Sequence, residues 1–494
     1  MLKNKLFFSQ KSAFPDRSEE AMPLFCFLRE RLTLKKKTFF RFFVFMLLPV
    51  AISVRPALSD EPPIMLSLEQ AIEMALDRNR SIQTAKNNLE SAALNLNTAH
   101  SDFDVKFRPV AGAGVTDGDS DISTGISLSK NMSQGMRVSV SPLISRRDGD
   151  YGSSLGLRLD VPLFRYFGEL VNTQYIRSSE FSLRSSERSL TSTKETIVLD
   201  TVTSFYAILE QKKNVEMNRF LAERFKSHAA IAQIKTDIGL AQPLDVYRSR
   251  IREKDAEVDL TESLENLQNA CDQLKSMLAI PQRTAIDICD TPVDIPAPDM
   301  EAHQIETIAF EHSITIKSAL DQLNESQRDA RIAEHYLLPD LTLSMDYIRS
   351  GLDDHLNRNM LLTTDDIWRV YLTSSTDFAR TAEKNSYRQS LIALKSKELE
   401  LADTKDQLSK EVRSQLDMLE KTRERIRLME AQIHDAMGKL ELAEVKFNNG
   451  MADNFDVIEA ETEHHLARLH LLSAQIDYII GTYRLRKIIG TLIG

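Results

Sequence analysis

The chain of 494 residues has few of the residues that end or kink helices, with only 16 glycines and 15 prolines. It also has no excess of basic residues, because 62 Lys and Arg stand against 72 Asp and Glu. The resulting net charge of −10 excludes a general nucleic-acid binder that holds its ligand on a basic surface. The scarcity of proline permits very long helices, since an interior proline costs a helix about 3 kcal/mol.

Motifs of the common catalytic sites are also lacking. We find no phosphate-binding loop, no Gly-x-Ser-x-Gly elbow, no His-Glu-x-x-His and no Cys-x-x-Cys. We therefore predict a protein that is not an enzyme and needs no cofactor. Glu463, His464 and His465 form a short metal-ligand-like run, but neighbouring residues on a helix point apart, which favours surface histidines over a metal site.

The amino terminus has the order of an export signal. Three lysines at 35–37 precede an apolar stretch at 42–54, and small residues follow at 57 and 59. This pattern predicts a signal peptide over residues 1–59, cleaved on export; a start at Met22 and a retained anchor are the alternatives. Cys271 and Cys289 remain after cleavage and can pair as a disulfide in an oxidising compartment, although the sequence does not show their distance.

Two segments without proline predict helices of unusual length, at residues 166–238 and 379–449. Four shorter helices are expected at residues 68–104, 244–280, 302–337 and 455–490. Two short helices placed end to end match one long helix, about 110 Å at 1.5 Å per residue. This equality predicts a wall of long antiparallel helices with coiled-coil-like packing.

Strand-like segments lie between the helices. They are expected at residues 107–115, 123–128, 136–143 and 154–163, and again at 341–347 and 367–373. Several alternate apolar and polar residues, which is typical of a soluble sheet or of a membrane barrel wall. The export signal, and the lack of a run of 18 apolar residues after it, favour the barrel.

The chain contains an internal duplication. Ala75 and Ile82 match Ala309 and Ile316 at an offset of 234, and residues 239–246 match 450–457 at an offset of 211. We therefore divide the mature chain into a first helix-strand-helix repeat at 60–286, a Pro-rich linker at 287–300 and a second repeat at 301–494. Both repeats are expected to form one domain.

These features resemble the TolC-type outer-membrane efflux protein family. The resemblance is carried by residues 66–72 at the start of the first repeat, Pro162-Leu163-Phe164 after its last strand, and the two Gly-x-Ala-x-x-(Leu/Phe)-Asp-Val turns. It implies a mainly α protein whose long antiparallel helices form an α-barrel, with four strands per chain in a trimeric, twelve-stranded outer-membrane β-barrel. Two departures are residues 374–378, which replace the second Pro-Leu-Phe, and a first β region with four strand candidates instead of two.

The resemblance also implies a function. Such a homotrimer sits in outer-membrane lipid, extends far into the periplasm, and is the exit duct of a tripartite efflux pump or a type I secretion system. Its expected partners are a periplasmic adaptor protein and an inner-membrane pump, with no nucleic acid. The rival hypothesis is a periplasmic coiled-coil scaffold without a pore, which would not need two alternating β regions.

Two sites follow from the resemblance. The turns after the long helices are expected to dock the adaptor, through Gly239, Leu240, Ala241, Gly450, Met451 and Ala452. The alternative for both glycines is a simple helix-ending role. The pore constriction is carried over to Asp456, Glu459 and Phe447. Asp456 is also placed to stabilise the start of its helix, as its equivalent Asp245 is in the first repeat. Ala452 stands where the family has a basic residue near the gate.

Overall fold

The computed structural model describes residues 64–116, 119–147, 149–239, 242–289, 302–353, 365–449, 451–452 and 454–493. The expected signal peptide at 1–59 and most of the expected linker at 287–300 lie outside these residues. The described helices and strands follow the order expected from the duplication, with helices on both sides of each group of strands. Among the described residues, none of the helices combines the length and apolar character needed to cross a bilayer.

The helices of the first repeat are close to those expected. They are α1 (Leu68–Arg78), α2 (Arg80–Ser101), α3 (Glu169–Asn172), α4 (Gln174–Asp237) and α5 (Pro243–Met277). The expected single helix at 68–104 is interrupted at Asn79, whose extended backbone ends α1 and begins α2. The Asn79 side chain accepts a hydrogen bond from the Ser81 amide and donates one to the Met277 carbonyl, 3.0 Å away. Asn79 thus ties the break to the end of α5.

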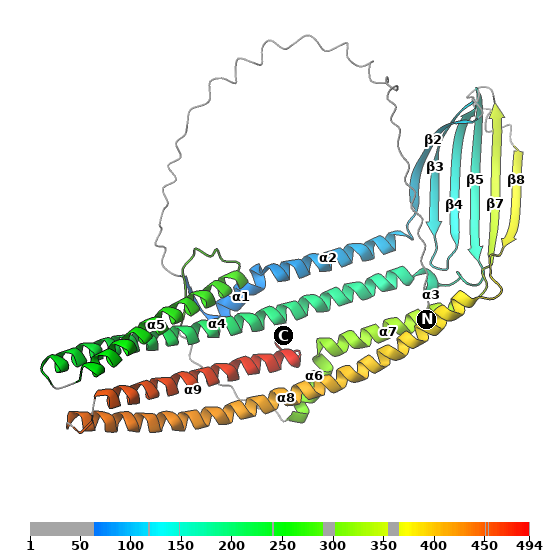
Figure 1. The fold of residues 1–494 in the computed structure, drawn as a ribbon. Coiled ribbons are helices and arrows are strands. Elements are labelled where there is room, and N and C mark those ends of the chain that lie inside the picture. Colours follow the sequence, from blue (N-terminus) through cyan, green and yellow to red (C-terminus); the bar gives the residue numbers. More distant parts are fainter. Residues whose placement is uncertain are drawn as a thin grey trace, which may run out of the picture. The chain divides into compact units, whose positions relative to one another are not determined.

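The second repeat has the same arrangement of helices. They are α6 (Ala302–His312), α7 (Ile314–His335), α8 (Thr381–Asn448) and α9 (Asn454–Ile488). The expected helix at 302–337 is interrupted at Ser313, which matches Asn79 at the repeat offset of 234. α4 and α8 contain 64 and 68 residues, so the predicted long helices are confirmed. α4 runs beside α5, and α8 beside α9 (Figure 1).

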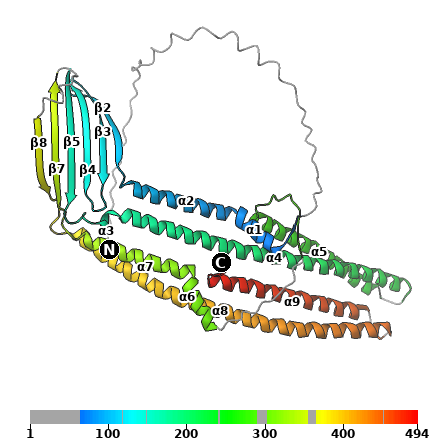
Figure 2. The same cartoon turned by 180° about the vertical axis from the view of Figure 1, so that it is seen from behind.

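The helices enclose two apolar clusters. α1, α4 and α5 form the first together with Ile476 and Ile479 of α9, and α6, α8 and α9 form the second. Figure 2 shows these helices from behind. Ala75 and its equivalent Ala309 both have 0% of their surface exposed. A two-stranded parallel sheet, which the sequence analysis did not predict, adds Leu66 and Ile288 to the first core; it pairs β1 (Ile64–Leu66) with β6 (Ile286–Ile288).

The larger sheet is antiparallel throughout, in the order β2-β3-β4-β5-β7-β8 (Figure 1). Its strands are β2 (Lys106–Thr116), β3 (Asp119–Asn131), β4 (Arg137–Arg147), β5 (Asp150–Pro162), β7 (Thr342–Asp353) and β8 (Asp365–Thr373). All six expected strands are present, and each covers its expected range except for one residue in three of them: Met136 before β4, Leu163 after β5 and Leu341 before β7.

The expectation of four strands per chain in the sheet is wrong, because this chain supplies six. β3 and β4 form a hairpin that is paired with β2 on one side and with β5 on the other. This pairing satisfies backbone groups that a projecting loop would leave to water. Adding two strands also keeps β5 antiparallel to β2, so the chain returns to the helices on the same side of the sheet.

Candidate functional site

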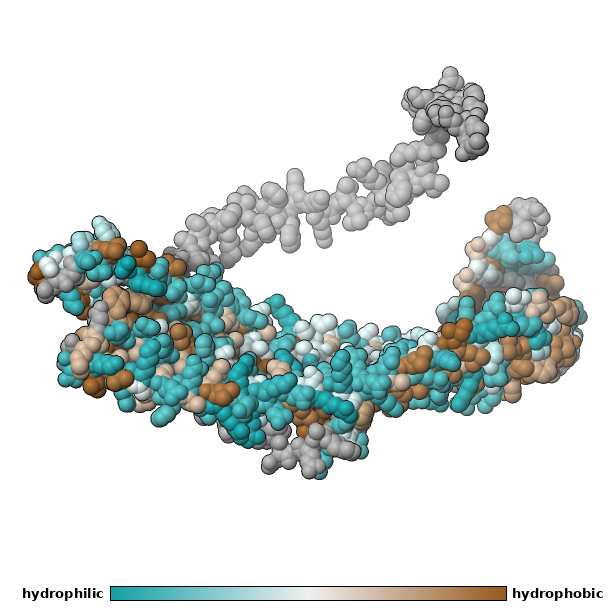
Figure 3. All heavy atoms as spheres, turned by 60° about the horizontal axis from the view of Figure 1, so that its bottom comes forward, coloured by the Kyte–Doolittle hydropathy of each residue, from teal (hydrophilic) through white to brown (hydrophobic). Residues whose placement is uncertain are grey.

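One face of the six-stranded sheet is apolar. The pairing register places one residue from every strand in a single row: Phe107, Leu128, Val140, Leu157, Tyr347 and Trp368. The Tyr347 and Trp368 rings lie 4.5 Å apart at the end of this row. Apolar side chains gather over the sheet, on the right of Figure 3. Trp368 is 75% exposed, which is unusual for tryptophan and indicates a surface made for an apolar medium.

The opposite face of the sheet is polar. Its corresponding row contains Lys106, Ser129, Ser139, Arg158, Asp346 and Arg369. The Arg158 guanidinium lies 3.1 Å from the Asp346 carboxylate and also donates a hydrogen bond to the Tyr371 hydroxyl. Because successive strand residues point to opposite faces, an apolar face and a polar face are both products of the same alternation. Such a sheet can separate an apolar medium from water.

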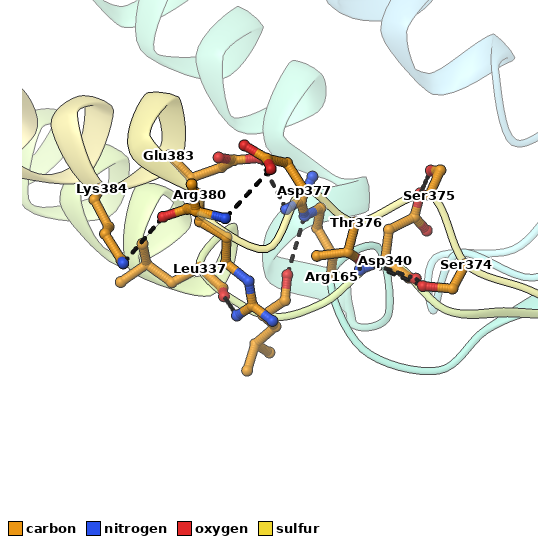
Figure 4. Close-up of polar contacts among 12 residues, drawn as sticks. Arg165, Leu337, Asp340, Ser374, Ser375, Thr376, Asp377, Arg380, Glu383 and Lys384 are labelled. Carbon is orange, nitrogen blue, oxygen red and sulfur yellow. Dashed lines mark hydrogen bonds and ion pairs between the residues drawn. The ribbon is translucent and has the colours of Figure 1, made fainter.

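The two connections from the sheet to the long helices are tied together (Figure 4). Arg165, after β5, forms an ion pair of 3.0 Å with Glu383 in the first turn of α8, and both side chains are largely buried. Asp340, before β7, is bound by hydroxyl groups of the segment after β8; they belong to Ser374, Ser375 and Thr376. The residues that replace the second Pro-Leu-Phe therefore hold this connection in place.

The turn from α4 to α5, which we call the tip of the first repeat, contains a glycine in the left-handed region of backbone conformation. Gly239 has φ of +79° directly after the end of α4, and its amide donates to the Thr236 carbonyl. This conformation agrees with the helix-ending role, since glycine adopts it without strain. α5 then begins with Pro243 and a capping box in which Asp245 accepts a hydrogen bond from the Gln242 amide. Leu240 and Ala241 lie outside the described residues.

The turn from α8 to α9, the tip of the second repeat, has exposed apolar residues. Met451 is 72% exposed, and its amide donates to the Lys446 carbonyl at the end of α8. Ala452 is half-buried, whereas Gly450 lies outside the described residues. Phe447 is an exposed residue of the last turn of α8. Both turns thus lie at chain reversals between paired helices, where a partner can reach them.

The two residues expected at the constriction lie at the start of α9. Asp456 is in its first turn and Glu459 is exposed. The sequence analysis missed the cation beside them, Lys439 on α8, whose ammonium lies 3.9 Å from Glu459 and 2.7 Å from Glu463. The hydrogen bond that Lys439 donates to Glu463, with the nearby charges of Glu463, Glu459 and Asp456, raises the pKa of Lys439. Ala452, which stands where the family has a basic residue near the gate, carries no charge. Lys439 is the basic residue that links α8 to α9 here.

The tip helices of the two repeats carry opposite charges at equivalent positions. α5 has Arg248, Arg250 and Arg252, and the offset of 211 places Glu459, Glu461 and Glu463 on α9. The Arg224 guanidinium of α4 lies 3.0 Å from Glu461, so α9 is also tied to the first repeat. This inversion of charge could have been found from the sequence, by comparing the charged residues at positions 211 apart as well as the apolar ones.

The remaining candidate sites have separate environments. The His465 ring packs 4.8 Å from that of Phe220, and burial lowers the pKa of His465. In the described part of the chain, no group of three or more His, Cys, Asp or Glu side chains is arranged to hold a metal ion. Cys271 packs against the first core and its pKa is raised by burial, whereas Cys289 is exposed, and no disulfide joins them.

Comparisons with known proteins agree with this architecture. The family model described as outer membrane efflux protein matches residues 308–491. The outer membrane protein TolC of Vibrio cholerae serotype O1 is 23% identical over 335 residues, which cover 64% of this chain and 74% of that protein.

Solved channels have the same fold. The outer membrane protein VceC of Vibrio cholerae matches with a TM-score of 0.65 and 15% identity, covering 86% of this chain and 96% of its own. The outer-membrane channel OprN matches with a TM-score of 0.64 and 17% identity, covering 86% and 90%. The resemblance to TolC-type outer-membrane efflux proteins is confirmed.

Proposed function

Because the chain resembles TolC-type outer-membrane efflux proteins, we propose that three copies form the exit duct of a tripartite efflux pump or a type I secretion system. The duct passes small molecules or proteins from the periplasm to the exterior. The observation that carries this proposal is the sheet with one apolar and one polar face, joined directly to helices of 64 and 68 residues. A scaffold without a pore has no use for such a sheet.

The two faces and the long helices have distinct roles in this duct. The apolar row contacts outer-membrane lipid, and the polar row of Ser139, Arg158 and Asp346 lines a water-filled lumen. A helix of 64 residues is about 96 Å long at 1.5 Å per residue, which carries the passage deep into the periplasm. The chain's contribution is therefore a passage and its opening, without catalysis or a cofactor.

The gate of the duct lies at the start of α9. In a threefold assembly, Asp456 and Glu459 of each chain surround the narrow end, with Phe447 beside them. This ring of carboxylates attracts cations to the narrow end of the duct. Lys439 partly neutralises the ring and holds α9 against α8, since its ammonium contacts Glu463 at 2.7 Å.

The docking partner meets the exposed chain reversals at the tip. These are residues Gly239, Leu240, Ala241, Gly450, Met451 and Ala452, and the apolar side chain of Met451 is 72% exposed. A periplasmic adaptor protein occupies this surface and connects the duct to an inner-membrane pump. A bulky residue at Gly239 has to adopt φ of +79°, so it distorts the turn while the trimer still assembles.

Planar-bilayer recordings test the duct and its gate together. Trimers purified from outer membranes should give single channels that select cations. The double variant with Asp456→Ala and Glu459→Ala should reduce cation selectivity several-fold. The matched first-repeat variant Asp245→Ala should leave cation selectivity unchanged. Folded trimers that stay silent would favour the scaffold. A double variant with unchanged selectivity and a lower melting temperature would assign Asp456 to helix capping alone.

A further inference from the structure

The β3–β4 hairpin continues both faces of the sheet without a break. On its apolar side lie Ile126 and Leu128 of β3 and Val138 and Val140 of β4. On its polar side lie six serines, Ser123, Ser127 and Ser129 of β3 with Ser139, Ser141 and Ser145 of β4. A loop projecting into water gains nothing from this alternation, whereas a strand in a membrane wall requires it.

We propose that the membrane part of the duct is an eighteen-stranded β-barrel, with six strands from each of three chains. In this barrel the free edge of β8 pairs with the free edge of β2 in the next copy of the same chain. The inference rests on the proposed trimeric duct. It differs from the twelve-stranded barrel that the family resemblance implies, because the extra hairpin becomes part of the wall.

The hairpin is fixed at its helix-side turn. The Gly168 amide, just before α3, donates to the Gln134 carbonyl at 2.9 Å, and the Asn131 side chain donates to the Asp102 carbonyl at 3.1 Å. Gly135 has φ of +95°, and a Cβ there would lie 2.4 Å from the Tyr166 carbonyl oxygen. The turn therefore sits tightly on the sheet–helix connection, and β3 and β4 cannot swing out as a separate loop.

The open edges of the sheet need further strands. β2 and β8 are not paired with each other, and six strands are fewer than the eight of the smallest membrane barrels. The six strands of this sheet contain 9 to 13 residues, which is long enough for the 9–11 residues needed to cross a bilayer. β2 leaves the helices and β8 returns to them, so pairing between copies is antiparallel like every other pair in this sheet.

The size of the helical wall favours eighteen strands. Three chains place about twelve helix columns side by side, and at 8–10 Å between axes they form a circumference of roughly 95–120 Å. Eighteen strands, about 4.8 Å apart and tilted by about 40°, give a circumference of roughly 113 Å. Twelve such strands give only about 75 Å. The wider barrel joins the helices with less change in diameter.

Single nitroxide labels on β4 test whether the hairpin lies in the wall. In a background with Cys271→Ser and Cys289→Ser, labels are placed at Val140→Cys and Ser139→Cys, with Leu157→Cys on β5 as the lipid-facing control. In trimers reconstituted into phospholipid vesicles, we expect the labels at 140 and 157 to be accessible to oxygen from the lipid. The label at 139 should be accessible to a water-soluble nickel chelate instead. Water accessibility at both 139 and 140, with 157 in lipid, would overturn the proposal.

A spin-label distance between copies tests the width. The label is placed at Ser154→Cys on the polar face of β5, in the full chain and in a variant whose residues 115–149 are replaced by a four-residue turn. Gly114 and Asp150 share a register row, so β2 and β5 can then pair directly. We expect the distance in the full chain to be about 1.5-fold longer, since barrel diameter grows with strand number. Equal distances would overturn the eighteen-stranded barrel.

The two proposals fail in different ways. If trimers conduct ions but the β4 labels and the distances give a twelve-stranded wall, the duct stands and the wider barrel is wrong. If the full chain forms no outer-membrane trimer, the duct itself is wrong. Where the shortened variant does not assemble, the β4 labels in the full chain still decide the question.

Discussion

The two repeats share their helices but differ in their strands and in the charges of their tips. Some equivalent buried positions keep the same residue, as in Ala75 with Ala309 and Leu274 with Leu485. The first repeat has four strands in the large sheet and the second has two. Close packing of the helices restricts which residues can be substituted there. The sheet, in contrast, accepts the insertion of a complete hairpin, because two added strands preserve the directions of the others.

The tips show a second kind of divergence. α5 carries arginines at three positions where α9 carries glutamates, and α9 is the helix tied to its neighbours by Lys439 and Arg224. The equivalent of Lys439 in the first repeat is His228, which is buried and stacks 5.0 Å from Phe455 at the start of α9. An unchanged duplication would place like charges near each other. The two tips have thus become complementary, and α9 is the helix whose release should matter most.

The largest expected effect comes from a charge in the apolar row. Val140→Arg in the first repeat and Tyr347→Arg in the second should both prevent outer-membrane insertion, because an arginine on the lipid face costs about 2–4 kcal/mol at the bilayer midplane. Heat-resistant trimers in outer-membrane fractions are the readout. Ser139→Arg, on the polar face of the same strand, is the matched control and should insert normally. If Val140→Arg inserts normally and Tyr347→Arg does not, the extra strands are not part of the membrane wall.

A smaller effect is expected from the link between α8 and α9. Lys439→Met removes the cation that contacts Glu463 and Glu459, so α9 should move away from α8 more often and single-channel conductance should rise several-fold. Arg250→Met is the first-repeat control, because Arg250 donates its hydrogen bond, at 3.1 Å, to the neutral Gln233. An equal response of both variants in planar bilayers would remove the distinction between the two tips.

The smallest effect concerns a buried acid of the first repeat whose equivalent in the second repeat is exposed. Glu195 on α4 is buried, and the loss of hydration raises its pKa despite the opposing charge of Lys487, whereas its equivalent Asp406 is exposed. An acid with a raised pKa in the folded state favours folding at acid pH, and this contribution is lost as the pH rises through the raised pKa. Glu195→Gln should therefore raise the melting temperature relative to wild type more at pH 8 than at pH 4.

Asp406→Asn is the control for this prediction. Because Asp406 is exposed on α8, its replacement should change the melting temperature little and equally at both pH values. A pH-independent effect of Glu195→Gln, measured by circular dichroism, would contradict the assignment of the shift to burial.

The sequence predicted the long helices, the six strands and the tip turns because each depends on local periodicity and on glycine and proline positions. It did not predict the break at Asn79, since the apolar spacing continues through it and the side chain is held by Met277, far away in the chain. The place of the β3–β4 hairpin in the sheet depends on pairing between distant strands. Lys439 was missed because its partners lie on another helix. Such contacts arise only when the chain is folded.

The central claim is that three copies of this chain enclose one continuous lumen whose membrane wall includes the extra hairpin. Single-particle electron cryomicroscopy of the trimer in lipid nanodiscs tests it most directly. The account predicts eighteen strands around an open lumen, with Val140 and Leu157 facing lipid and Ser139 and Arg158 facing water. A closed wall of twelve strands with β3 and β4 outside it, or an assembly without a lumen, would contradict the account.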